Sequence, residues 1–373
     1  MAGIYIHIPF CKQACHYCNF HFSTSLGLKD EVLRMMLKEI GLRKDYLQGQ
    51  SISSVYFGGG TPSLLSQTEL LLIWEELSRW FDITADAEVT LEANPDDISI
   101  EKLKQWGPTP INRLSIGIQS FHDADLRYMN RAHSALDARN CIQWAQDAGF
   151  ENMTIDLIYG TPTLSDEMWQ YNMQRTFGLG IPHFSAYSLT VEPRTALSAL
   201  IKKQQLPPVD DNKAARHLLM LMDGAAQNEY EHYEISNFAR NEHYARHNSS
   251  YWQAAHYLGL GPSAHSYNGA SRSWNIANNA KYIKALQQNT LPLETETLSV
   301  SERYNEYLLT SLRTKWGVDL THIEQHFGFE RRQRLIKETA LLNGKILLKG
   351  NQLTLTNQGK LLADSIISDL FEI

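Results

Sequence analysis

The chain lacks several features that would place it in common functional classes. It has only 4 cysteines in 373 residues, too few for a disulfide-stapled secreted scaffold, and Cys141 falls in an apparent helix where a buried thiol is expected. No apolar run approaches the roughly 20 residues that cross a bilayer, and no secretory signal is recognised at the amino end. The P-loop, HExxH and nucleophile-elbow motifs are also absent. These absences predict a soluble, cytoplasmic protein with at most peripheral membrane contact.

An excess of positive charge is missing as well. The formal net charge is -7, and the only clustered arginines are Arg331, Arg332 and Arg334, which fit a solvated helix face. Nucleic-acid binding needs a basic surface that neutralises several phosphates. We therefore predict no nucleic-acid partner, although the C-terminal pattern described below is common in DNA-binding domains.

Three of the cysteines that are present, Cys11, Cys15 and Cys18, lie within eight residues. A [4Fe-4S] cluster normally takes four thiolates, so three close ligands without a nearby fourth leave one iron open to an exogenous ligand. The same cysteines with His16 or His21 could instead hold a structural zinc ion. The next motif along the chain favours the cluster.

That motif is a glycine run directly after an apolar, strand-like segment. Residues 56–62 read Tyr-Phe-Gly-Gly-Gly-Thr-Pro, after the apolar stretch 52–55. Consecutive glycines let backbone groups approach a small polar ligand closely, although such a run alone more often marks a tight turn. One strand and one helix after the cysteine loop, it indicates a binding loop.

Together, the CxxxCxxC loop and the glycine loop resemble those of the radical S-adenosylmethionine (SAM) superfamily. The resemblance implies a [4Fe-4S] cluster on the three cysteines and a SAM molecule whose methionine amino and carboxylate groups chelate the open iron. The glycine loop would meet the amino group at Gly59, Gly60 and Thr61. The aromatic positions that the family places beside the cysteines fall on Tyr17 and Phe20.

Over nearly its whole length, the chain is similar to the oxygen-independent coproporphyrinogen oxidase group. The SAM-binding positions of that group fall on Tyr5, Glu92, Gln119, Arg131 and Asp156. Gln119 and Asp156 could hydrogen-bond ribose hydroxyls, Arg131 could meet the methionine carboxylate, and Glu92 could accept from the amino group. Polar residues at strand ends are more often caps or turn residues. However, Glu92, Gln119 and Asp156 all end apolar runs, at the rim where barrel sites are built.

Alternating strand and helix patterns predict an α/β fold, an incomplete (β/α)6 radical SAM barrel. The strand candidates cover residues 3–8, 52–57, 87–91, 113–118, 153–158 and 184–189, and amphipathic helices are expected at 30–47, 67–80 and 135–148. We expect a radical SAM partial barrel with the cluster loop over 1–190 and an intermediate region over 191–298 that packs on the barrel. A C-terminal winged-helix-like α+β domain is expected over 299–373, with a hairpin at 346–355.

Two departures from the oxidase pattern point to a different relative. Phe20 stands where the oxidase carries a fourth cysteine, and the chain opens almost directly at Tyr5, without the N-terminal extension of the oxidase. The run His247-Asn-Ser-Ser-Tyr251-Trp252 resembles the HNxxYW motif of the HemW haem chaperone family. This resemblance implies haem as a further ligand, with His247 as the axial iron ligand and Tyr251 and Trp252 as aromatic surface for the porphyrin.

A histidine beside aromatic residues is more often a hydrogen-bonded structural residue, and His243, His256 or His265 could serve instead. His265 could also lie near the nucleoside. The resemblance implies a haem chaperone that binds a [4Fe-4S] cluster, SAM and haem and delivers haem to acceptor proteins such as those of the respiratory chain. The alternative is a radical SAM oxidoreductase of the coproporphyrinogen III oxidase type. A homodimer is left open.

Overall fold

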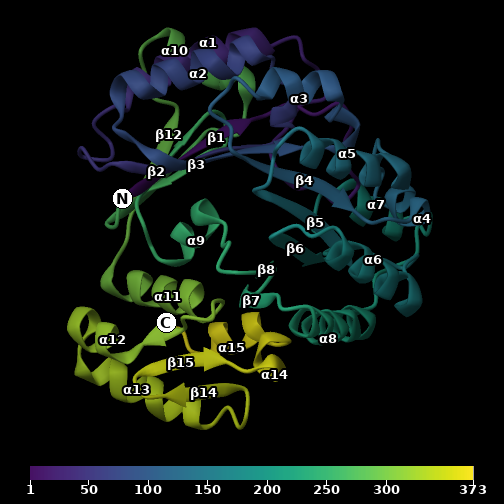
Figure 1. The fold of residues 1–373 in the computed structure, drawn as a ribbon. Coiled ribbons are helices and arrows are strands. Elements are labelled where there is room, and N and C mark those ends of the chain that lie inside the picture. The colour runs from purple at the N-terminus through teal and green to yellow at the C-terminus, as the bar shows by residue number, and fades with distance from the viewer. Residues whose placement is uncertain (373) are drawn as a thin grey trace.

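A computed structural model describes residues 1–372 and contains a sheet of 12 strands that curves into a half-barrel (Figure 1). Six neighbouring strands are parallel and follow one another in chain order, as the sequence predicts. They are β1 (Ala2–Ile8), β2 (Ile52–Gly59), β3 (Ile83–Ala93), β4 (Arg113–Gln119), β5 (Met153–Tyr159) and β6 (His183–Ser188). Near-continuous runs of buried apolar residues explain why these strands are recognisable in the sequence.

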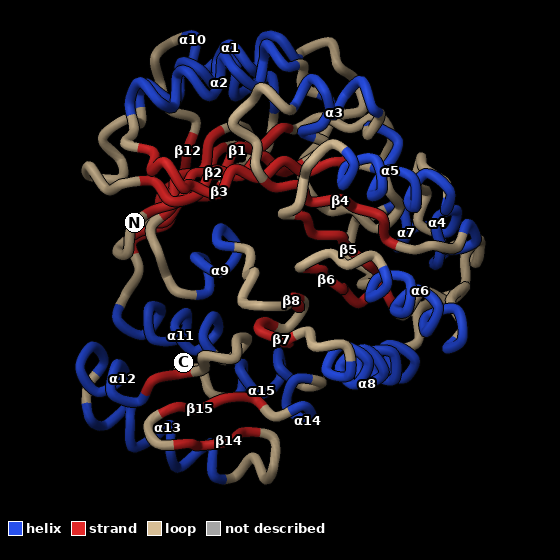
Figure 2. The backbone as a smooth tube through the Cα atoms, viewed as in Figure 1, coloured by secondary structure: helices blue, strands red, loops and turns tan. Residues whose placement is uncertain are grey.

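Helices cover the outer face of the parallel strands, with the concave face turned toward the rest of the chain (Figures 1 and 2). They are α1 (Lys29–Leu42), η1 (Pro62–Leu64), α2 (Gln67–Trp80), η2 (Pro95–Asp97), α3 (Ile100–Trp106), α4 (Asp123–Tyr128), α5 (Ala135–Asp147) and α6 (Asp166–Gly178). Capping boxes of Ser66 with Glu69 and of Ser134 with Asp137 start α2 and α5. The first helix ends at Leu42, five residues before the end of the predicted 30–47, and residues 43–49 continue as turns.

The sheet continues beyond the six predicted strands on both sides, which the sequence did not predict. Beside β1 lie the parallel strand β9 (Tyr257–Leu260) and the antiparallel strands β10 (His265–Tyr267), β11 (Ser271–Asn275) and β12 (Leu293–Thr297). Beside β6 lie the antiparallel strands β8 (Asn237–Ala239) and β7 (Glu231–Glu234). These strands have three to five residues each, too few for a hydrophobic pattern to mark them as strands.

A buried carboxylate joins the added strands near β1 to the barrel. Glu39 of α1 is 0% exposed and accepts hydrogen bonds from the Gly261 amide at 2.8 Å, the Tyr282 hydroxyl at 2.6 Å and the Asn275 side-chain amide at 2.6 Å. Tyr282 lies on α10 (Asn279–Gln287). This helix packs against α1 on the outside of the sheet (Figure 1).

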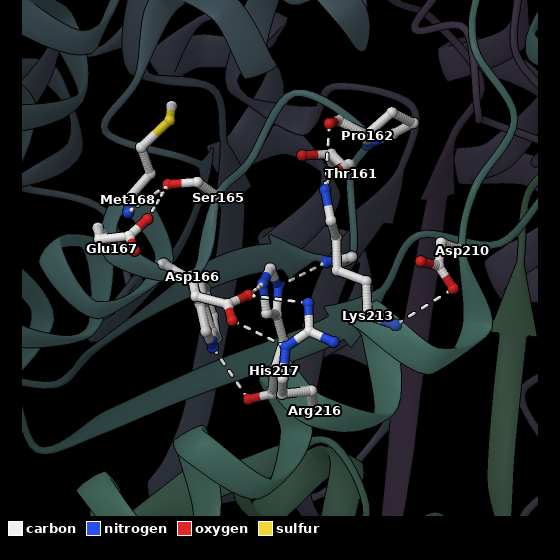
Figure 3. Close-up of polar contacts among 12 residues, drawn as sticks. Thr161, Pro162, Ser165, Asp166, Glu167, Met168, Asp210, Lys213, Arg216 and His217 are labelled. Atoms are coloured by element: carbon white, nitrogen blue, oxygen red, sulfur yellow. Dashed lines mark hydrogen bonds and ion pairs between the residues drawn. The ribbon is translucent and has the colours of Figure 1, made fainter.

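At the opposite side, α7 (Ala196–Lys202) and α8 (Asp211–Gln227) follow the barrel, separated by the loop that contains the predicted linker 206–211. Figure 3 shows Arg216 and His217 of α8 turned toward Asp166 at the start of α6. The Arg216 guanidinium donates to both Asp166 oxygens, at 2.8 and 3.1 Å, and Lys213 donates to the Thr161 and Pro162 carbonyls. These contacts fix α8 to the loop after β5.

The C-terminal part has three helices, a hairpin and two short helices around its own apolar core, as expected for a winged-helix-like domain. Its elements are α11 (Val300–Ser311), β13 (Val318–Asp319), α12 (Leu320–Phe327), α13 (Phe329–Ala340), β14 (Ile346–Lys349), β15 (Gln352–Leu355), α14 (Asn357–Lys360) and α15 (Ala363–Asp369). The domain boundaries at 190 and 298 stay predictions. Among residues 1–372, none of the helices combines the length and the apolar character that crossing a bilayer requires.

Candidate functional site

The carboxyl ends of the parallel strands surround a cavity of about 460 Å³. Almost all residues that the sequence assigned to the cluster and to SAM line it: Cys11, Cys15, Tyr17, Cys18, Phe20, Gly59, Gly60, Thr61, Glu92, Gln119, Arg131 and Asp156. These residues come from the loop after β1 and from the ends of β2, β3, β4 and β5, or from the loops beyond them. Strand direction therefore brings together residues that are up to 145 positions apart in the chain.

The loop after β1 carries the three half-buried cysteine thiols on one wall of this cavity. The Cys11 amide donates to the Ser23 carbonyl at 3.0 Å, which closes the loop, and burial raises the pKa of the Cys11 thiol to about 11. Among residues 1–372, no three His, Cys, Asp or Glu side chains are arranged around one metal ion. In a cubane each thiolate binds a different iron, so its ligands are spread more widely than those of a single ion. Cys141 is a fully buried thiol in α5, as predicted.

The glycine loop supports the cysteine loop by backbone contact. The Gly60 and Thr61 amides donate to the Ile8 and Phe10 carbonyls, at 2.9 and 2.7 Å. A Cβ atom on Gly60 would lie 2.6 Å from the Phe10 carbonyl oxygen, and Gly59 has a φ of 106°. Side chains here would push the two loops apart.

Arg131, in the loop between α4 and α5, extends across the cavity to the cysteines. Its Nη1 lies 3.2 Å from Cys15 Sγ, and its Nη2 donates to Asn94 Oδ1 at 2.7 Å and to the Gly117 carbonyl at 2.8 Å. Sequence reasoning did not select Asn94, which also donates to Thr61 at 3.2 Å. Its position two residues after Glu92, in the same strand-end run, was the available signal.

Two carboxyl groups with raised pKa values face the same cavity. Burial raises the pKa of Glu92 to about 8, with a further contribution from the charge of Asp156, and Glu92 accepts a hydrogen bond from the Tyr56 hydroxyl at 2.8 Å. Burial also raises the pKa of Asp156 to about 6. Near neutral pH, Glu92 is therefore mostly neutral until a cation arrives, which would favour its charged form.

Unsatisfied polar atoms indicate that the cavity is built for a polar ligand. Gln119 Oε1 and Arg131 Nε are buried and have no hydrogen-bond partner among the described residues. Gln119 also has a φ of 61°, a conformation that is costly outside glycine. A free amide acceptor, a free guanidinium donor and a protonated carboxyl fit a ligand with an amino acid end and hydroxyl groups. The residues present therefore fit SAM.

Tyr5 lies outside this first cavity and borders a second one of about 530 Å³. Its hydroxyl lies 3.2 Å from His7 Nδ1, and its ring clusters with those of Tyr56 and His247, at centroid distances of 6.1 and 6.4 Å, while these two rings stack on each other at 5.1 Å. Asn19–Phe20 borders both cavities. The second cavity is thus a direct neighbour of the first.

The HNSSYW segment forms α9 (Arg246–Trp252), which lies on the concave side of the sheet between the barrel strands and α11 (Figure 1). His247 is 1% exposed, and its two ring nitrogens are hydrogen-bonded to Ser54 Oγ at 2.9 Å and to the Tyr251 hydroxyl at 2.8 Å. Both nitrogens of this imidazole are therefore engaged in hydrogen bonds, and its role as an axial haem ligand stays a prediction. Tyr251 and Trp252, by contrast, line the second cavity.

The other candidate histidines differ in position. His265 lines the second cavity, whereas His243 and His256 border neither of the two cavities within the described part of the chain. His256 Nδ1 is paired with the Gln50 side-chain amide at 2.6 Å.

The start of α9 is held by a carboxylate of the barrel. The Glu88 carboxylate accepts hydrogen bonds from the Arg246 and His247 backbone amides and so caps this helix.

Comparisons with known proteins agree with this geometry. Residues 5–175 match the Radical SAM superfamily. The heme chaperone HemW of Mycobacterium tuberculosis is 33% identical over 99% of this chain and 94% of its own length. The heme chaperone HemW of Bacillus subtilis is 32% identical over 98% of both chains.

Among solved structures, coproporphyrinogen III oxidase (HemN) from Escherichia coli, described as a radical SAM enzyme, superimposes with a TM-score of 0.85. It covers 99% of this chain and 90% of its own, at 23% identity, which shows a shared fold. The two HemW relatives show more than a shared fold, because about one third of the residues are identical over nearly the full length. The aligned length includes the barrel, the α9 region and the C-terminal domain. The chain belongs to the HemW family of the radical SAM superfamily.

Proposed function

We propose that this protein is a haem chaperone: it holds a [4Fe-4S] cluster on Cys11, Cys15 and Cys18, binds SAM beside it, and receives haem for delivery to acceptor haem proteins. The observation that carries the proposal is the full-length similarity to proteins named heme chaperones, combined with a cavity that gathers the predicted cofactor residues. The acceptors that we propose are haem proteins of the respiratory chain.

The residues of the first cavity divide the work of binding SAM. The cluster would supply an iron with an open coordination position. The unpaired Nε of Arg131 is available to the methionine carboxylate, and Glu92 would accept from the amino group and lose its own proton as the cation binds. Gln119 at the end of β4 and Asp156 in the middle of β5 would form hydrogen bonds with ribose hydroxyls.

A second candidate function is an oxidase of the coproporphyrinogen III type. It is favoured by the fold shared with HemN over nearly the whole chain and by the same cofactor cavity. Phe20, 68% exposed between the two cavities, stands where the oxidase pattern has a fourth cysteine, which argues for the chaperone.

One set of assays separates the two functions. Anaerobically reconstituted protein is titrated with haemin, then mixed with an apo-haem protein, and in parallel incubated with dithionite, SAM and coproporphyrinogen. We expect stoichiometric haem capture, haem transfer to the apo-protein and no protoporphyrinogen. Formation of protoporphyrinogen without haem capture would instead establish the oxidase.

Variants test the cluster assignment in the same preparation. Cys15→Ser should lose iron, sulfide and the visible absorption of the cluster, because one of three thiolates is removed. Cys141→Ala is the matched control, since this thiol is buried in α5 away from the cavity, and it should retain the full iron content. Equal iron content in both variants would contradict the assignment.

A further inference from the structure

The second cavity is walled by aromatic rings from three neighbouring strands and from α9. Tyr5 of β1, Tyr257 of β9 and Tyr267 of β10 line it together with Trp252. Glu306 of α11 closes it on the side of the C-terminal domain. Its volume of about 530 Å³ lies within the range of about 300–1,000 Å³ that is typical of small-molecule sites.

Three imidazoles border this cavity, but they differ in whether a ring nitrogen is free. His7 is fully engaged, with Tyr5 at Nδ1 and the His21 carbonyl at Nε2. His21 pairs its Nε2 with the Asn279 side-chain oxygen at 2.8 Å, which leaves only its Nδ1 without a partner among the described residues. Among the described residues, neither ring nitrogen of His265 has a hydrogen-bond partner, and this side chain is exposed at the cavity.

The local structure of β10 explains why His265 faces the cavity. Side chains alternate along a strand, so His265 and Tyr267 share one face while Ser266 points to the other, where it is buried and accepts from the Gly259 amide at 2.9 Å. The His265 ring stacks on that of Trp274 in β11, with centroids 6.1 Å apart. The imidazole is thus supported on one side and open on the other.

We propose that the second cavity is where haem binds and that His265 is its axial iron ligand. This inference rests on the proposed function and changes the assignment of the ligand within it. The imidazole of His265 has both ring nitrogens unpaired among the described residues, and its ring is held in place by stacking on Trp274. Trp252, Tyr257 and Tyr267 supply the flat aromatic surface that a porphyrin ring packs against.

The rim supplies a cation for the acidic side chains of haem. Arg272 of β11 lies directly opposite Tyr267 in the register of β10 and β11, and its guanidinium is ion-paired with Glu306. A haem propionate could replace Glu306 as the partner of the Arg272 guanidinium, whose planar shape allows two parallel hydrogen bonds to a carboxylate. In this arrangement His247 is a positioning residue, because its hydrogen bond holds the Tyr251 hydroxyl.

The test compares histidine variants of the full-length, cluster-containing protein by haemin titration, with absorption and electron paramagnetic resonance spectra. His265→Ala should lose the imidazole-ligated Soret band and resonance signature, and added imidazole should restore them. His247→Gln should keep the ligation signature, and His243→Ala, exposed and outside the cavity, is the matched control. Arg272→Gln should weaken haem affinity without changing the ligation signature.

Two outcomes would overturn the inference in distinguishable ways. If the wild type binds haem and His265→Ala keeps its spectrum while His247→Gln loses it, the axial ligand is His247 and only this inference fails. If the wild type takes up no haem, the proposed function fails and the inference fails with it.

Discussion

Replacing Glu92 by glutamine should make the protein more stable while weakening SAM binding. The folded protein holds the Glu92 proton up to about pH 8, whereas an ordinary glutamate has a pKa of 4.5. Between these values the folded state binds more protons than the unfolded state, so the free energy of unfolding falls as pH rises, and the fall ends above about pH 8. Glutamine keeps the shape and an oxygen that accepts from Tyr56, but it has no charge to bury.

The magnitude follows from the two pKa values. At about 1.4 kcal/mol for each pKa unit, the buried charge costs roughly 2 kcal/mol at pH 6 and roughly 4 kcal/mol at pH 8. Glu92 borders a cavity that admits water, so we expect about half of this gain in the variant. Below pH 4.5 the two proteins should have nearly equal stability, because the carboxyl is protonated in both states.

Urea unfolding of the SAM-free protein from pH 4.5 to 8 measures this effect, with Glu75→Gln, an exposed substitution on α2, as the control. A stability difference that grows with pH for Glu92→Gln and stays flat for Glu75→Gln is expected. The Glu92 variant should also bind SAM about tenfold more weakly or worse, since a hydrogen bond to a charged group contributes about 1.5–3 kcal/mol. A stability gain over the wild type that is no larger at pH 8 than at pH 5 would refute the burial argument.

Three further substitutions test other parts of the structure. Arg131→Lys should weaken SAM binding by roughly tenfold in calorimetric titration, because an ammonium cannot replace the planar donor set, and undiminished affinity would remove Arg131 from the site. Glu39→Ala should lower the free energy of unfolding by about 3–5 kcal/mol in urea, because it breaks a buried charge network; a loss below about 1 kcal/mol would show that the added strands do not depend on it. Tyr251→Phe should cost about 1–3 kcal/mol by leaving a nitrogen of His247 unpaired, whereas the exposed Tyr171→Phe should be neutral. Equal stability of the two tyrosine variants would contradict that hydrogen bond.

The barrel was predictable because its signals are local. Each parallel strand is an apolar run, and helices such as α2 begin at capping boxes that are visible in the sequence. Glu92, Gln119 and Asp156 were selected by the resemblance to the oxidase group, and their expected place at the barrel rim supported the choice; Asp156 in fact lies in the middle of β5. The roles of these residues in cofactor binding stay predictions, although the structure brings the three side chains to one cavity.

The parts of the fold and of the site that the sequence did not predict depend on contacts between segments that are distant in the chain. Strands β7 to β12 are too short to give a clear hydrophobic pattern, and the sheet beside them offers the unpaired backbone groups with which they pair. Glu39 looks like a surface residue of an amphipathic helix until Asn275 and Tyr282 surround it. In the same way, no sequence pattern shows that Ser54 of β2 meets His247 and occupies its ring nitrogen.

The stretch Asn19–Phe20 forms part of the boundary of both cavities. A shift of this stretch changes the shape of both cavities at once. Two ligands that each favour one position of the stretch therefore influence each other's affinity. Thermodynamic linkage then makes the effect reciprocal. If SAM in the first cavity changes the affinity for haem in the second cavity by some factor, haem changes the affinity for SAM by the same factor. Under the proposed function, this shared boundary would link the binding and release of haem to the occupancy of the cluster and SAM site.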